Sequence, residues 1–263
     1  RWLAGEGVRE LILVAQDPTA YGEDWGRPGA ICELLDRLQE IDGIRWIRIL
    51  YAYPERISDA FIAAMVRNTK VVPYLDLPIQ HCDDAVLKAM NRRGGRKEIE
   101  DAIARLRAAI PGITLRTTLI AGFPGETEEQ YAELCDFVKT VRFDRLGCFA
   151  YSAEENTVAA KMPNQIDEET KQRRADHIME LQAEVSAERE GEKVGHTYEC
   201  ICDGVDDETG MYLLRTKADC PEIDGNVLTP ADTPLETGAF YKVTITDSDT
   251  YDLYGYAEER LED

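Results

Sequence analysis

The chain has 263 residues, enough for one large domain or two ordinary ones. Hydrophobic residues make up 44% and charged residues 31%, which excludes a disordered chain and is typical of a folded globular protein. The sequence contains no run of about 18 apolar residues, so no membrane-spanning helix is predicted, and no basic, apolar leader opens it. We therefore expect a cytoplasmic protein that makes no contact with a membrane.

The charge is strongly negative, because 51 Asp and Glu residues stand against 30 Lys and Arg residues and give a net charge of −21. Such a surface repels phosphate backbones and therefore disfavours binding to nucleic acids. A basic protein is the partner that this charge favours.

Seven cysteines, an odd and scattered set, argue against the disulfide framework of a secreted protein. No loop holds three of them. Cys200 and Cys202 share one face of a predicted strand but have no third ligand nearby. We predict that the cysteines act as small buried hydrophobic residues and that the chain holds no metal site.

In chain order, a helix end at residues 1–7 is followed by short apolar runs that alternate with amphipathic segments. Strands are predicted at 11–15, 46–51, 71–79, 113–121 and 146–151, the first of them buried on both faces. Helices are predicted at 29–40, 58–68, 83–94, 97–109 and 127–140. Several helix starts carry capping residues: Ser58, Asp83 or Asp84, and a capping box at Thr127–Gln130. This alternation predicts a parallel sheet, either open and doubly wound or closed into a barrel.

The pattern changes after residue 165. One long charged helix is predicted at 166–192, and short strand-like runs follow at 196–202, 210–215, 226–228, 241–246 and 251–256. Short strands separated by turn residues predict a small all-β barrel or sandwich. We therefore divide the chain into an α/β core at 1–165, a linker helix at 166–193 and a β domain at 194–263. The β domain holds 17 acidic and 4 basic residues, a net charge of −13.

Ligands of parallel α/β folds lie at the carboxyl ends of the strands, so the polar residues there are the candidates for a site. Four strand ends qualify, namely residues 16–22, 51–56, 78–84 and 117–126. The third combines Gln80, His81 and Cys82 with two acids, a set that could bind a cofactor or relay a proton. In the fourth, glycines flank Pro124 and could let backbone groups approach a flat ligand. Simpler interpretations remain open: an Asx turn at Asp17, a helix cap at Asp83 beside a buried Cys82, and a helix end at residues 91–96.

Five long motifs in order carry a family resemblance that covers essentially the whole chain. They are QDPTAYG, RILYAYPERISD, VVPYLDLPIQHCDDAVLKAMNRRGG, LRTTLIAGFPGETEEQ and FDRLGCFAYSAEENTVAA. Together they closely resemble the methylthiotransferases of the radical S-adenosylmethionine (SAM) superfamily. PYLDLPIQHCDD, NRRGG and the ending TDSDTYDLYGY are most similar to the branch that modifies an aspartate of ribosomal protein S-twelve.

The resemblance implies a partial (βα)6 TIM-like barrel that lacks its first strand, followed by a small β-barrel called a TRAM domain. It implies SAM and two [4Fe–4S] clusters as cofactors. One cluster would cleave SAM to a 5′-deoxyadenosyl radical, which would take hydrogen from the aspartate β-carbon before a methylthio group is inserted. The family binds its radical cluster with a CxxxCxxC loop, which does not occur here. We therefore expect a piece truncated at its N-terminus and inactive alone.

By the same resemblance, SAM would lie across the strand ends, with its adenine near the backbone of residues 120–124. The implied cofactor-binding residues are Gln16, Gln80, His81, Arg116, Thr118, Ile120, Gly122 and Pro124. From its charge, the β domain is expected to bind the basic S-twelve protein through Asp203, Asp206, Asp207, Asp247, Asp249 and Asp252. No catalytic side chain and no electron donor is assigned.

Three other functions remain open. A tRNA methylthiotransferase that modifies adenosine-derived bases would need a basic TRAM domain, and the charge of −13 argues against it. An inactive, acidic interaction module is the alternative outside enzymology. An unrelated phosphate-binding barrel enzyme is disfavoured because no glycine-rich phosphate loop with a Lys is present.

Overall fold

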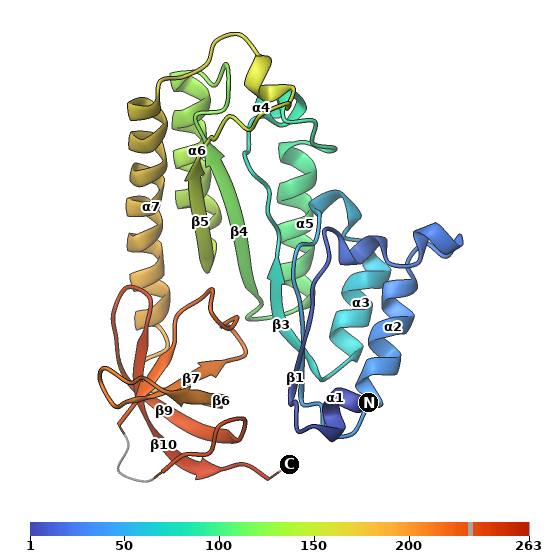
Figure 1. The fold of residues 1–263 in the computed structure, drawn as a ribbon, viewed down its shortest axis with the longest axis vertical. Helices are drawn as coiled ribbons and strands as arrows, with labels where there is room; N and C mark the ends of the chain where they lie inside the picture. Colours follow the sequence, from blue (N-terminus) through green and yellow to red (C-terminus); the bar gives the residue numbers. More distant parts are fainter. Residues whose placement is uncertain (231–233, 263) are drawn as a thin grey trace.

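A computed structural model describes residues 1–230 and 234–262. Figure 1 shows a parallel sheet flanked by helices, with a long helix, α7 (Glu168–Gly191), along one edge and a small β domain against one end. The carboxyl ends of β4 and β5 point away from that β domain.

The sheet contains five parallel strands in the order β1-β2-β3-β4-β5 and stays open. The strands are β1 (Glu10–Leu13), β2 (Trp46–Ile49), β3 (Val71–Asp76), β4 (Thr114–Ala121) and β5 (Arg145–Ala150). The helices of this part are α1 (Trp2–Gly5), α2 (Ala30–Gln39), α3 (Asp59–Arg67), α4 (Asp84–Ala89), α5 (Arg96–Ala109) and α6 (Glu128–Val141). The predicted parallel α/β architecture is confirmed.

The predicted caps fix where these helices begin. Ser58 accepts a hydrogen bond from the Phe61 amide at 3.1 Å, and Asp83, one of the two residues considered, accepts one from the Val86 amide at 2.9 Å. Thr127 and Gln130 form the expected capping box. Each cap satisfies an amide that the first turn of a helix leaves without a partner.

The expectation for the first strand was wrong in one respect. The run at 11–15 was predicted to be buried on both faces, but β1 is half-buried and ends at Leu13. Val14 is 63% exposed. The reason is position: among the described residues, β1 pairs only with β2 and forms an edge of the sheet.

The two faces of the sheet bury different partners. Helices cover the outer face, where Ile47, Leu75 and Leu119 belong to the main core. On the inner face, Trp46 and Tyr74 pack instead in a second core that includes Phe240 of the β domain. The Trp46 and Phe240 rings meet edge to face at 4.9 Å. The β domain therefore replaces solvent on part of the inner face, the part nearest the amino ends of the strands.

The β domain is a closed barrel with the strand order β10-β8-β7-β6-β9. Its strands are β6 (Thr197–Val205), β7 (Tyr212–Thr216), β8 (Val227–Thr229), β9 (Phe240–Ser248) and β10 (Leu253–Arg260). Cys200 and Cys202 lie in its apolar core, as predicted for small hydrophobic side chains. The small all-β barrel of the prediction is thus confirmed.

Buried ion pairs join the β domain to the sheet. Glu10 of β1 binds Arg48 of β2 and Arg215 of β7, each at 2.8 Å. Arg145 of β5 binds Asp219 of the β domain and Glu190 of α7, each at 2.6 Å. Removing one partner from such a pair leaves a buried charge without compensation, so the β domain is held in a defined orientation.

Candidate functional site

The half of the inner face nearest the carboxyl ends of the strands is left uncovered by the β domain, although Ile120 packs there against a small cluster of Val86, Phe123 and Tyr151. Along β4, Thr117 and Leu119 are buried on the helix side, whereas Thr118 and Ile120 alternate with them and are half-buried. On β5, Phe149 is 62% exposed. Exposed apolar side chains at this position form a surface on which a flat ligand could lie.

Gln80 extends this surface beyond the end of β3. Its backbone adopts φ 70°, and its amide donates to the Thr118 carbonyl at 2.9 Å. In return, the Gln80 carbonyl accepts from the Ile120 amide at 2.8 Å. A left-handed conformation is uncommon for a residue other than glycine and is held here by these bonds. Three of the sequence-predicted site residues, Gln80, Thr118 and Ile120, are therefore immediate neighbours.

His81 lies behind this surface in a buried polar network. The Asp83 amide donates to Nδ1 of His81 at 2.9 Å, which assigns the proton of a neutral ring to Nε2. Nε2 is 3.4 Å from Oε2 of Glu126, and Arg174 of α7 binds the other oxygen of Glu126 at 2.7 Å. All three side chains are buried. His81 is thus enclosed by protein groups and supports the loop that carries Gln80.

The space at Gly122 is used by the protein itself. Gly122 has φ +76°, and a Cβ placed there would lie 2.5 Å from Cγ of Lys171 on α7. Its amide donates to both carboxylate oxygens of Glu126, at 3.1 and 3.0 Å. The expected room for a ligand is therefore occupied by α7, and Pro124 beside it is buried as well.

Arg116 and Gln16 lie farther from this group. Arg116 is the third residue of β4, where it binds Asp76 at 3.0 Å and lies 3.7 Å from Asp224 of the β domain. Burial raises the pKa of the Asp76 carboxyl although Arg116 opposes the shift. Gln16 is exposed in the loop after β1. Neither residue is brought next to Gln80 by a contact in this structure.

Sequence reasoning missed two kinds of residue. Phe149 and Val14 were not singled out as lining residues, although the alternation along each strand places them on the inner face. Glu126 stood in a quoted motif without a role, and Arg174 lies on a helix that no local pattern connects to it. Strand periodicity could have identified Phe149 and Val14. The contact between Glu126 and Arg174 joins distant parts of the chain and left no signal in the local sequence.

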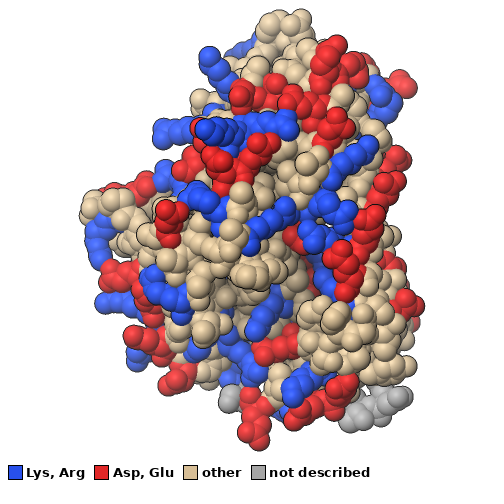
Figure 2. Space-filling view, turned by 180° about the vertical axis from the view of Figure 1, so that it is seen from behind, with Lys and Arg blue, Asp and Glu red and all other residues tan. Residues whose placement is uncertain are grey.

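The predicted partner-binding aspartates form two groups in the β domain, and most of them are engaged in local structure. Asp203 pairs with Arg215. Asp206 accepts from the Thr209 hydroxyl at 2.6 Å, Asp249 from the Tyr251 amide at 2.9 Å, and Asp252 from the Asn226 amide at 2.7 Å. Asp247 is exposed and accepts from the Ser248 amide at 2.9 Å, and Asp207 is exposed as well. Figure 2 shows acidic and basic side chains interspersed over one face of the molecule, without a continuous acidic area.

The seven cysteines are all free thiols, and five of them are buried. Burial raises the pKa of Cys82 and of Cys148 to about 12 each, so both are protonated at neutral pH. Within residues 1–230 and 234–262, no three His, Cys, Asp or Glu side chains are grouped in a way that could hold a metal ion.

No helix in the described part of the chain is long and apolar enough to cross a membrane.

Comparison with known proteins adds independent findings. Residues 1–138 match the radical SAM superfamily, and residues 194–257 match the TRAM domain. The chain is 47% identical over 259 residues to the "Ribosomal protein uS12 methylthiotransferase RimO" of Pelobacter propionicus, covering 98% of this chain and 57% of that protein. It is 46% identical over 254 residues to the RimO of Desulfitobacterium hafniense, covering 96% and 57%.

The chain therefore spans a little more than half the length of these relatives. Among solved structures, the coproporphyrinogen III oxidase HemN of Escherichia coli, a radical SAM enzyme, is similar with a TM-score of 0.49 and 21% identity. That similarity covers 60% of this chain and 37% of HemN.

Proposed function

This chain belongs to the radical SAM superfamily, and we propose that it is part of a methylthiotransferase that modifies ribosomal protein uS12. The reaction would add a methylthio group to the β-carbon of an aspartate, as the sequence motifs imply. The observation that carries the proposal is 44–47% identity to relatives of that name over nearly the whole chain. The activity is proposed for the protein to which these 263 residues belong, and the piece alone is proposed to be inactive.

We propose the uncovered half of the inner face as the SAM site. When bound, SAM would supply the radical chemistry for which the superfamily is named. Thr118, Ile120 and Phe149 would line its position, and Gln80 would extend that lining past β3. His81, Gly122 and Pro124 would act from behind, because protein atoms enclose them. Contacts of Gln16 and Arg116 with SAM remain proposals.

The residues present do not fit an iron–sulfur cluster. Such a cluster needs several thiolates held together, and the described residues bring no metal-binding group together. We propose that the two [4Fe–4S] clusters implied by the motifs take their ligands from other parts of the full-length protein. No step of the reaction is assigned to a cluster here.

Charge supports a basic protein as substrate and argues against RNA. The net charge of −13 in the β domain would steer a basic ribosomal protein toward this molecule and repel tRNA. Since five of the six predicted aspartates are engaged in local contacts, the exposed Asp207 is the better candidate for direct contact. The electron donor stays unassigned.

The test uses the full-length protein, reconstituted without oxygen and supplied with SAM, a reductant and a sulfur source. We expect the mass of uS12 to rise by one methylthio group on the target aspartate, while tRNA stays unmodified. Modification of tRNA without modification of uS12 would move the function to the tRNA-directed alternative. Modification of neither substrate by a cluster-loaded, SAM-cleaving enzyme would contradict both assignments. A full-length protein that neither loads a cluster nor cleaves SAM would favour the inactive interaction module.

A further inference from the structure

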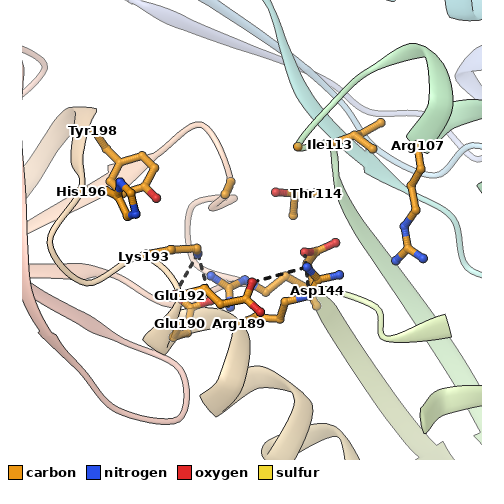
Figure 3. Close-up of a pocket in the computed structure, with 13 residues that line it drawn as sticks. Arg107, Ile113, Thr114, Asp144, Arg189, Glu190, Glu192, Lys193, His196 and Tyr198 are labelled. Carbon is orange, nitrogen blue, oxygen red and sulfur yellow. Dashed lines mark hydrogen bonds and ion pairs between the residues drawn. The ribbon is translucent and has the colours of Figure 1, made fainter. Parts of the chain in front are cut away.

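A cavity of about 490 Å³ lies at the end of the molecule opposite to the proposed SAM site. Its walls come from the carboxyl ends of α5 and α7, the amino ends of β4 and β5, and the first residues of β6. Figure 3 shows His196 and Tyr198 facing Arg107 and Thr114 across the cavity, with Arg189 and Lys193 between them. None of these residues is used by the function proposed above.

Basic side chains gather at this cavity although the protein as a whole is acidic. Four cations (Arg107, Arg145, Arg189 and Lys193) face the cavity, against three carboxylates. One of these carboxylates, Glu190, is buried and already bound by two of the cations, at 2.6 Å from Arg145 and 2.8 Å from Lys193. Arg145 is also bound by Asp219 at 2.6 Å. The charges of Glu190, Arg145 and Lys193 are therefore compensated within the wall, and Arg107 and Arg189 are the cations that remain for a ligand.

Two guanidinium groups in the cavity donate no hydrogen bond to a carboxylate. Arg107 donates only to the Val141 and Arg142 carbonyls, at 2.8 and 3.0 Å. Arg189 forms ion pairs of 3.7 Å with Asp144 and Glu192, which are too long for hydrogen bonds, and donates to the Arg142 carbonyl at 3.4 Å. Among the described residues, nothing accepts a hydrogen bond from its buried Nε. Burial lowers the pKa of Arg107; the carboxylate of Asp144 opposes this shift, and the charge of Arg189 adds to it.

Two neighbouring guanidinium groups that repel one another and donate no hydrogen bond to a carboxylate form an arrangement that an anion would stabilise. Arginine favours phosphate because its planar fork of N–H donors matches the phosphate oxygens. The volume is within the range of small-ligand pockets. We propose that this cavity binds the phosphate group of a small phosphate monoester of about the size of a nucleoside monophosphate.

The net charge of the whole chain favours a small phosphate ligand over RNA. A chain with a net charge of −21 repels a polyanion at a distance, whereas a single phosphate carries only one or two charges into the cavity. The site is also distant from the uncovered half of the inner face, so phosphate binding and SAM binding can be tested independently.

The test titrates the 263-residue chain with inorganic phosphate and with adenosine monophosphate, followed by calorimetry and amide NMR. We expect saturable binding with Kd below about 10 mM. Changes in amide chemical shift should be confined to the cavity residues. Arg189→Gln should weaken binding by roughly tenfold or more, the loss of one charged phosphate contact. Arg37→Gln removes the same charge from an exposed site on α2 and should leave the affinity unchanged.

If Arg189→Gln does not fold, Tyr198→Phe removes only the hydroxyl that faces the cavity and should still weaken binding. Absence of saturable binding, or equal affinity in the Arg189 and Arg37 variants, would overturn the proposal. Binding of a single-stranded RNA oligonucleotide without binding of the monophosphate would also overturn it and indicate a polyanion surface.

Discussion

At the scale of single residues, Glu126 connects the proposed cofactor site to the rest of the protein. Its carboxylate receives the Gly122 amide, lies beside His81 and binds Arg174 of α7. Three segments that are far apart in the sequence therefore depend on one buried side chain. This role follows from burial together with the number of donors around a single carboxylate.

We predict that Glu126→Gln lowers the free energy of unfolding by about 3 kcal/mol, because it removes one charge from a buried pair. Urea denaturation of the 263-residue chain measures the change. Glu133→Gln on α6 serves as control, since Glu133 is exposed and its pair with Arg96 is expected to contribute less than about 1 kcal/mol. Similar losses in the two variants would show that burial of the pair does not matter.

The sequence carried the single-residue features that depend on near neighbours. Caps at Ser58 and Thr127 were correct, and so was the Asx turn at Asp17, whose Oδ1 accepts the Thr19 amide at 3.0 Å. The role of Gly122 was misjudged because the side chain that fills its space, Lys171, lies on a helix 49 positions later in the chain. Periodicity and turn chemistry describe local geometry and carry no information about such contacts.

At the scale of elements, the predicted strands and helices were nearly all correct, yet the predicted burial of the first strand was wrong. The patterns could not show that β1 forms an edge of the sheet, nor that the β domain covers half of the inner face. The β domain covers the inner face because Phe240 packs against Trp46 and Tyr74, and because ion pairs join segments that are distant in the sequence. These contacts decide which half of the sheet stays open to a ligand.

The pair of Arg145 and Asp219 gives this interface a predictable pH dependence. Burial opposes ionisation of Asp219, but Arg145, Lys193 and Thr216 outweigh it and lower the pKa of its carboxyl below 3.8. A lowered pKa contributes stability that is complete above the unfolded value and is lost as the pH falls through the folded value.

We therefore predict that Asp219→Asn reduces the acid dependence of unfolding below about pH 4, besides lowering stability at neutral pH. Urea unfolding between neutral and acidic pH measures both effects. Asp207→Asn, at an exposed position of the same domain, is the matched control and should leave both unchanged. If the free energy of unfolding of the Asp219 variant falls with acid as steeply as that of the wild type, this pair is not the source of the acid dependence.

At the scale of the whole molecule, the chain has two separate ends. The uncovered inner face lies at the carboxyl ends of the strands, and the β domain lies at the other end (Figure 1). A basic substrate attracted by the β domain would have to extend along the sheet to present its target at the proposed SAM site. Charge would bring the substrate to the protein, and the open face would decide where the reaction takes place.

The central claim is that the open half of the inner face holds SAM, and one measurement tests it most directly. The full-length, cluster-loaded protein is titrated with SAM as wild type, as Thr118→Tyr and as Val66→Tyr. Thr118→Tyr places a ring in the middle of the open face, whereas Val66 is exposed on the outside of α3. We predict that SAM affinity falls by roughly tenfold or more for Thr118→Tyr, through steric exclusion, and is unchanged for Val66→Tyr. Equal affinity in all three correctly folded proteins would contradict the assignment.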